Sequence, residues 1–98
     1  MDRDALSGIE EFCAAQYYSF DAEAWLERAQ RDGLRVAAAA EYLALTSWYG
    51  HEEALKDVAA RIRARLGGDD GTRLPLARFS GRTRYLLARR QYRFDEQP

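Results

Sequence analysis

The chain has 98 residues, of which 47% are hydrophobic and 32% are charged, and its formal net charge at pH 7 is −1. This length and composition predict one domain, residues 1–98, with a core large enough to fold without a metal or a disulfide. The single cysteine, Cys13, excludes an internal disulfide, and the sequence shows neither an apolar leader nor an apolar run of membrane-spanning length, so we expect a soluble cytoplasmic protein.

The first two helices are predicted from apolar spacing and from capping residues. Residues 4–18 carry apolar side chains at three- and four-residue steps, which is typical of a helix with one buried stripe. Cys13 lies on that stripe, so we expect its thiol to be packed rather than activated. Residues 22–32 are expected to form the second helix, with Asp21 as its N-cap and Gly33 as a left-handed stop.

The third helix, at about residues 34–49, is predicted to be the centre of the fold. Apart from tyrosine hydroxyls, the stretch 36–49 has only three polar side chains, those of Glu41, Thr46 and Ser47. A helix that is apolar nearly all round is buried by neighbours on several sides. The predicted fold class is therefore all-α, a small single-domain bundle of four to five helices with this helix central.

Glu41 is the most unusual residue of the third helix, because a carboxylate among apolar neighbours loses water. Burial raises the pKa of a carboxyl unless a cation pairs with it. Such a group is sometimes functional, but it is more often half of a structural ion pair. The many arginines of the C-terminal third favour the structural interpretation.

The stretch after Gly50 predicts a fourth helix with one apolar face, glutamates near its start and arginines near its end. Residues 67–75 contain three glycines and a proline, so we expect a flexible loop there, and residues 95–98 should form a frayed tail. A di-iron helical bundle needs two Glu-x-x-His motifs, whereas His51 is the only histidine here. We therefore expect no metal and no other cofactor.

Residues 77–94 contain six arginines and four aromatic residues and not one acidic residue. Ser80 and Gly81 can start a helix over residues 82–94, and a strand is the weaker alternative because the apolar alternation breaks down. The candidate residues for binding a protein or a nucleic acid are Arg82, Arg84, Tyr85, Arg89, Arg90, Tyr92 and Arg93.

The charges of the chain are strongly polarised along the sequence. Residues 1–60 have five Lys or Arg against twelve Asp or Glu, whereas residues 61–98 have ten against four. The basic segment could hold nucleic acid, with arginines on phosphates and tyrosines on bases. Alternatively, the basic segment could close onto the acidic helices of the same chain. This second interpretation is favoured, because an acidic body repels a polyanion.

No spacing of nucleophile and base in the sequence supports catalysis, so we expect no enzyme and no catalytic residue. Exposed tyrosine beside arginine is a composition enriched at protein interfaces. The leading hypothesis is a non-enzymatic protein-binding protein, an adaptor, inhibitor or regulator of bacterial or phage type. A homodimer that pairs acidic with basic faces is one version of it. A nucleic-acid-binding protein is the alternative, and an enzyme using Glu41 in an open polar pocket is a third.

Overall fold

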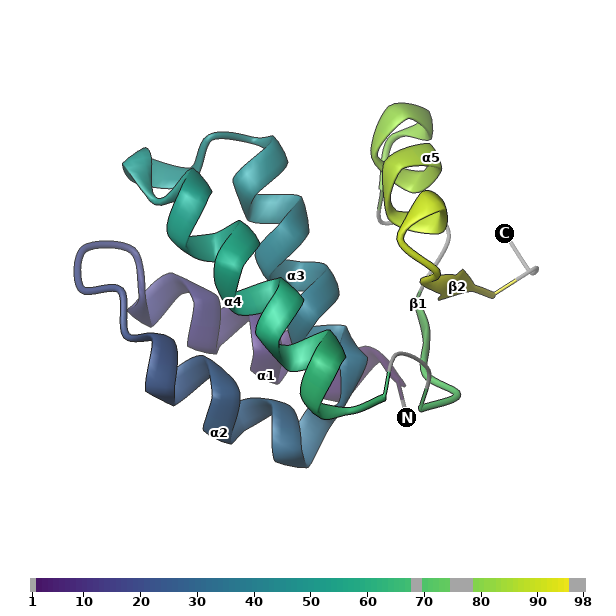
Figure 1. Ribbon diagram of the computed structural model, residues 1–98, viewed down its shortest axis with the longest axis horizontal. Helices are drawn as coiled ribbons and strands as arrows, with labels where there is room; N and C mark the ends of the chain where they lie inside the picture. The colour runs from purple at the N-terminus through teal and green to yellow at the C-terminus, as the bar shows by residue number, and fades with distance from the viewer. Residues whose placement is uncertain (1, 68–69, 75–78, 96–98) are drawn as a thin grey trace.

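Five α-helices make up most of the computed structural model (Figure 1), which describes residues 2–67, 70–74 and 79–95, with the backbone alone for residues 2–7. The helices of this described part are α1 (Asp2–Ala15), α2 (Ala22–Asp32), α3 (Leu34–Leu45), α4 (Glu52–Arg65) and α5 (Gly81–Arg89). A 3₁₀ turn, η1 (Trp48–Gly50), precedes α4. Two short strands, β1 (Arg73–Leu74) and β2 (Arg93–Phe94), form a parallel pair. The prediction of an all-α fold with four to five helices is confirmed.

The central element is α3, as predicted. It packs most extensively against α4 and also contacts α1, α2 and α5. Figure 1 shows α3 and α4 side by side, with α1 and α2 below them and α5 set to one side. Small side chains at Ala37 and Ala40 are fully buried, which lets neighbouring helices approach the α3 backbone closely. The apolar run of the sequence therefore forms the middle of the core.

The third helix ends four residues earlier than predicted. The helix stops at Leu45, and Ser47 and Tyr49 both adopt left-handed backbone conformations, with φ of 56° and 49°. The apolar pattern continues to Tyr49 because the following turn is also partly packed, so periodicity alone could not mark the end. This difference places Trp48 and Tyr49 in a turn rather than on a helix.

The second helix has the predicted bounds, and its first turn is capped as expected. The Asp21 side chain accepts hydrogen bonds from the backbone N–H groups of Glu23 at 3.1 Å and Ala24 at 3.3 Å. Helix α1 ends at Ala15 rather than at residue 18, so Tyr17 and Tyr18 lie in the connection to α2. The shorter α1 is what frees these two tyrosines for the surface described below.

The predicted helix over residues 82–94 is wrong in its second half. Ser80 caps α5 through a 3.3 Å bond from Thr83 N–H, but the helix ends at Arg89. The chain then reverses at Gln91, where φ is 72°, and residues 93–94 pair with residues 73–74. Both the helix and the strand alternatives for this segment are therefore realised, one after the other.

The predicted loop over residues 67–75 contains β1, and Leu74 within it is buried. Asp95 extends the strand pair, because its N–H donates to the Leu74 carbonyl at 2.9 Å. Residues 96–98 of the predicted frayed tail lie outside the described residues. Within the part of the chain that the structure describes, no helix is long and apolar enough to cross a membrane.

Candidate functional site

Glu41 is buried on α3, with 6% of its surface exposed, and two arginines reach it from other elements. Arg63 of α4 places Nη1 3.6 Å from one carboxylate oxygen, and Arg90, just after α5, places Nε 3.3 Å from the other. Burial raises the pKa of the Glu41 carboxyl, and the charges of Arg90 and Arg63 oppose that rise only in part. The sequence predicted such a pairing without naming the two arginines.

Tyr92 belongs to this buried cluster and not to the surface. It is 5% exposed, and the Arg63 guanidinium carbon lies 5.3 Å from the centre of its ring. Burial, together with the nearby Glu41 charge, raises the pKa of its hydroxyl. Tyr92 was expected to be a surface binding residue, and this expectation is corrected, because a ring buried on Glu41 and Arg63 cannot stack on a base or dock a partner.

A pocket of about 180 Å³ opens beside the buried cluster. The residues that line it are Glu41, Leu45, Lys56, Ala60, Arg63 and Arg90. Three of these six residues are cations and one is an anion, and none is a serine, cysteine or histidine. The pocket therefore has the charges to hold an anion.

The exposed part of the basic segment lies on α5 and β2. Tyr85 is 61% exposed, and the Arg89 guanidinium carbon lies 5.8 Å from the centre of its ring. Arg82 and Arg93 are exposed, and Arg84 is half-buried. The seven predicted binding residues thus divide into two groups. Arg90 and Tyr92 meet Glu41, although the Arg90 side chain is also 45% exposed, and the other five lie at or near the surface.

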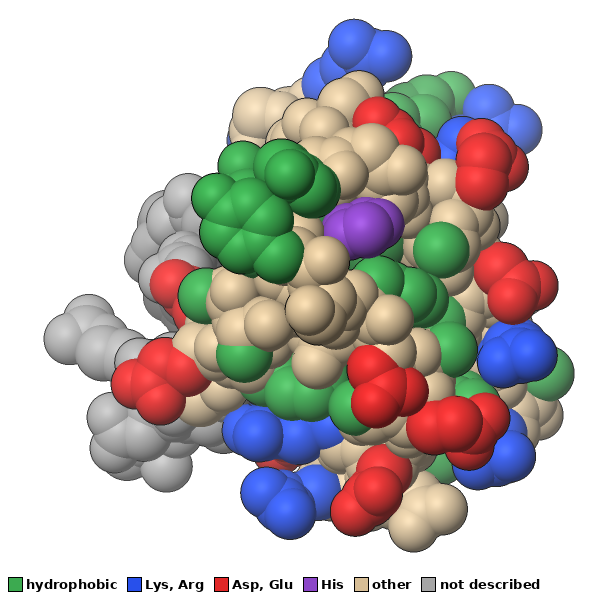
Figure 2. Space-filling view, turned by 90° about the vertical axis from the view of Figure 1, so that its left-hand side faces the viewer, with side chains coloured by type: hydrophobic (Ala, Val, Ile, Leu, Met, Phe, Trp, Pro, Cys, Tyr) green, Lys and Arg blue, Asp and Glu red, His purple; other side chains and the backbone are tan. Residues whose placement is uncertain are grey.

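A second group of aromatic side chains gathers where the α1–α2 connection meets the turn before α4. We call Tyr17, Tyr18 and Tyr49 the aromatic patch. Their ring centres lie 4.7–4.9 Å apart, and Tyr17 also packs edge-on against Trp48 at 4.8 Å. Tyr18 and Tyr49 are 74% and 53% exposed. Figure 2 views this end of the molecule, and hydrophobic side chains stand out beside the histidine.

His51 holds the two segments of the patch together. Its Nε2 lies 3.2 Å from the Tyr17 carbonyl oxygen, and its ring lies 5.6 Å from the ring of Phe20. Tyr49 itself keeps a left-handed conformation that is costly for a residue with a side chain. The sequence signalled a surplus of tyrosines, but their meeting at one point depends on the tertiary fold.

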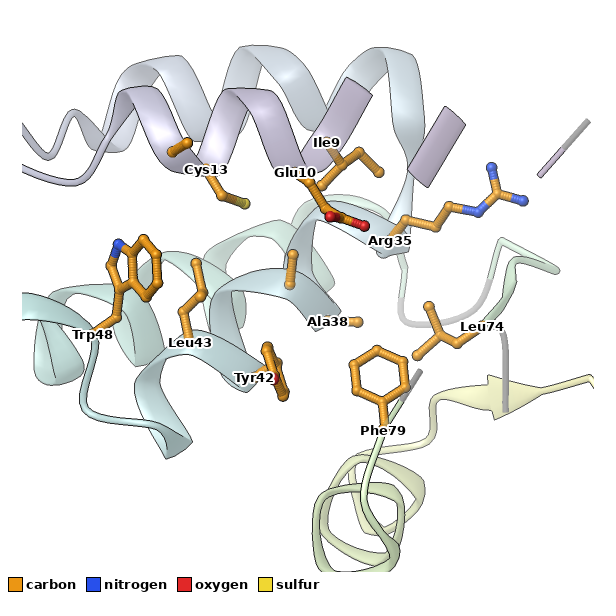
Figure 3. Close-up of a pocket in the computed structure, with 12 residues that line it drawn as sticks. Ile9, Glu10, Cys13, Arg35, Ala38, Tyr42, Leu43, Trp48, Leu74 and Phe79 are labelled. Atoms are coloured by element: carbon orange, nitrogen blue, oxygen red, sulfur yellow. The ribbon is translucent and has the colours of Figure 1, made fainter. Parts of the chain in front are cut away.

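A largely apolar groove of about 310 Å³ separates α1 from α3 (Figure 3). Its residues include Cys13, Leu43, Leu74 and Phe79. Burial raises the pKa of the Cys13 thiol to about 12, so the thiolate is scarce at neutral pH. Among the described residues, no group of three or more His, Cys, Asp or Glu side chains could hold a metal ion.

Comparison of the chain with protein-family models, with curated proteins and with solved structures found no match. The fold and the surfaces are therefore the basis for a functional proposal.

Proposed function

We propose that the protein is a non-enzymatic, cytoplasmic protein-binding protein, an adaptor, inhibitor or regulator, which contacts its partner through the aromatic patch. The observation that carries this proposal is the exposure of Tyr18 and Tyr49 at 74% and 53% while their rings stay in mutual contact. Aromatic side chains held in one geometry lose little conformational entropy on binding, and tyrosine is enriched among the residues that dominate interface energies.

The charges around the patch indicate the chemistry of the partner. The stretches of chain on either side of the tyrosines, residues 10–27 and 36–55, contain no lysine or arginine. Exposed carboxylates flank the tyrosines in sequence, among them Asp21 and Glu53. Arginine and lysine bind both aromatic faces and carboxylates, so the partner surface should be basic.

Affinity capture from the cell of origin, followed by mass spectrometry, tests the proposal with matched baits. The test bait is the double variant Tyr18→Ser, Tyr49→Ser, and the control bait is Tyr85→Ser, which removes an equally exposed tyrosine from α5. We expect one protein to be captured by the unchanged chain and the control but not by the double variant. Purified, that protein should bind at least tenfold more weakly to the double variant, about 1.4 kcal/mol.

The proposal fails if the captured protein binds the double variant as tightly as the control, or if its contact surface is acidic. Both variants must first show the same thermal unfolding midpoint within a few degrees, since loss of an exposed side chain changes stability by about 0.5 kcal/mol. This comparison separates loss of a contact from loss of the fold.

Nucleic-acid binding is the alternative, and it is favoured by one observation, the exposed Tyr85 with Arg89 against its ring. Together with Arg82, these residues offer a stacking surface and two phosphate contacts. Titration of labelled single- and double-stranded oligonucleotides at two salt concentrations tests it. Binding should weaken steeply with salt and with Arg82→Gln, Arg89→Gln. Flat titrations at low salt would exclude this alternative.

A further inference from the structure

The hydrogen bonds within the buried cluster around Glu41 are imperfect. Three side-chain atoms of this cluster, Glu41 Oε2, Arg63 Nε and Tyr92 Oη, lack a hydrogen bond of good geometry within the described residues, although Arg90 Nε lies 3.3 Å from Glu41 Oε2 and Tyr92 and Arg63 both interact with the Glu41 carboxylate. Buried polar groups in native proteins are almost always satisfied, so imperfectly bonded groups beside a pocket mark a place where a polar ligand can complete their hydrogen bonds. The groups of this cluster adjoin such a pocket, since Glu41 and Arg63 both line it.

The charges of the pocket are unbalanced in one direction. Lys56, Arg63 and Arg90 line it together with a single carboxylate, Glu41, which gives an excess of two positive charges when all four groups are ionised. Lys56 is 3.6 Å from Glu53 as well, but Glu53 is 90% exposed, and such a surface pair is weak. The ion pairs of the folded chain therefore leave most of this positive charge in the pocket unbalanced.

The pocket is large enough for a small solute and too small for a macromolecule. Its volume of about 180 Å³ is roughly six times the volume that one molecule occupies in liquid water. Guanidinium groups present fixed pairs of donors that match the oxygen atoms of carboxylates and phosphates. A small oxyanion therefore fits both the space and the donors.

We propose that the pocket between α3, α4 and the segment after α5 binds a small oxyanion, either inorganic phosphate or a short dicarboxylate, through Lys56, Arg63 and Arg90. The bound anion takes hydrogen bonds from the arginines and from the Lys56 ammonium. It competes with Glu41 for the same cations, so the carboxylate limits the affinity. This site is separate from the aromatic patch and does not depend on the proposed function.

Titration of the full ¹⁵N-labelled chain with inorganic phosphate tests the site, with the Arg63 and Arg90 Nε–H signals as the readout. Sodium chloride at the same ionic strength is the reference, and succinate is the second probe. We expect a saturable shift of both signals with phosphate or succinate and none with chloride. The stronger of the two probes identifies the phosphate or the carboxylate as the ligand class.

Three variants sharpen the test. Lys56→Gln should weaken binding about fivefold, because it removes one half-exposed cation from the pocket. Arg61→Gln, the matched control, removes an equally exposed cation of α4 that pairs with Asp57 and does not line the pocket, and it should leave binding unchanged. Glu41→Gln should tighten binding several-fold, since both arginines are then free for the anion.

Equal effects of chloride and phosphate would overturn the proposal, because the signal shifts would then report general screening of charges by salt and not a bound anion. Equal losses in Lys56→Gln and Arg61→Gln would also overturn it. If Glu41→Gln does not fold, the comparison of Lys56→Gln with Arg61→Gln still tests the proposal.

Discussion

Glu41 lies in the centre of the fold at a position where a carboxylate is expensive to bury. The effective penalty for removing such an ion from water is several kcal/mol, and an ion pair offsets it only with good geometry. Arg90 and Arg63 approach at 3.3 and 3.6 Å, which are ion-pair distances but longer than those of good charge-assisted hydrogen bonds. The pairing is therefore incomplete, and burial keeps the pKa of Glu41 raised.

This raised pKa predicts how stability depends on pH. A carboxyl whose pKa is higher in the folded state stabilises the fold most when it is protonated, and this contribution is lost as the pH rises through the folded pKa. In the variant Glu41→Gln that dependence is absent. As the pH rises above the ordinary glutamate pKa of about 4.3, the free energy of unfolding of the variant should rise relative to that of the unchanged protein.

Urea unfolding at a series of pH values measures this difference. Glu27→Gln, which removes an exposed carboxylate from α2, is the control. If the free energies of unfolding of Glu41→Gln and the unchanged protein change with pH in parallel, burial does not raise the pKa of the Glu41 carboxyl.

Gln91 has a backbone conformation that glycine normally provides. After α5, the Gln91 N–H bonds to the Ala88 carbonyl at 2.9 Å and the Tyr92 N–H bonds to the Leu87 carbonyl at 3.2 Å. This is the Schellman pattern of a helix end, with Gln91 at the left-handed position and φ of 72°. The reversal directs Tyr92 inward, toward Glu41 and Arg63.

Gln91→Gly should therefore stabilise the protein. The left-handed conformation costs a residue with a side chain about 1–2 kcal/mol, and the greater freedom of glycine in the unfolded chain cancels part of the gain. We expect the free energy of unfolding to rise by roughly 0.5–1 kcal/mol, measured by urea denaturation. Gln91→Ala keeps the Cβ and should show no such gain. A variant with glycine that is less stable than the alanine variant would contradict this account.

At the scale of elements, Gly33 joins α2, α3 and the segment before β1. Its φ of 66° and ψ of −149° are accessible only to glycine, and its N–H closes α2 by bonding to the Ala29 carbonyl at 2.7 Å. Asp70 reaches the same point, where its Oδ2 accepts a 3.0 Å bond from the Leu34 N–H. Asp70 therefore caps α3 from 36 residues further along the chain.

Gly33→Ala should disrupt this junction. A Cβ at residue 33 would overlap Asp70 Oδ2, so the variant suffers both the unfavourable φ and the loss of the cap. We expect a loss of roughly 2–3 kcal/mol in the free energy of unfolding. Gly67→Ala is the matched control, because Gly67 also has positive φ, 76°, but a Cβ there meets nothing within 4 Å.

The control should lose only about 1 kcal/mol, the cost of the backbone conformation alone. Calorimetry of the two variants measures the difference. Equal losses would mean that the Asp70 contact contributes nothing to stability.

The elements that the sequence predicts well are those with local signals. Asp21 and Gly33 mark both ends of α2, and the apolar run after residue 34 marks α3 as central. The end of α5 has no such signal, because Gln91 occupies the position at which glycine would mark a stop. The pairing of residues 73–74 with residues 93–94 depends on contacts between distant segments, which no local pattern encodes.

The candidate sites, too, are predictable from the sequence only where the signal is local. An ion pair for Glu41 follows from its apolar surroundings, but which arginines supply it depends on how α4 and α5 dock on α3. The inward position of Tyr92 follows from the reversal at Gln91, which the helical periodicity of residues 82–90 does not reveal.

At the scale of the whole molecule, the two exposed aromatic surfaces lie far apart. Figure 1 places the α1–α2 connection and η1, which carry the aromatic patch, at one end of the long axis, and α5 at the other. The stretches that carry the patch tyrosines, residues 10–27 and 36–55, contain no lysine or arginine, whereas α5 carries Arg82 and Arg89. Contacts between these two surfaces on different copies would be head-to-tail, unless both contacts form reciprocally across a two-fold axis in an antiparallel pair.

This geometry bears on the proposed homodimer of acidic and basic faces. We expect light scattering to give the mass of one chain, 11.2 kDa, in dilute solution. At high concentration and low salt, the mass should rise without a plateau at two chains, because head-to-tail contacts continue from copy to copy. Added salt, which screens exposed charges over about 10 Å at 0.1 M, should reverse the rise. The double variant Arg82→Gln, Arg89→Gln should stay at one chain under all these conditions, and a salt-insensitive plateau at twice the mass of the chain would contradict the head-to-tail geometry.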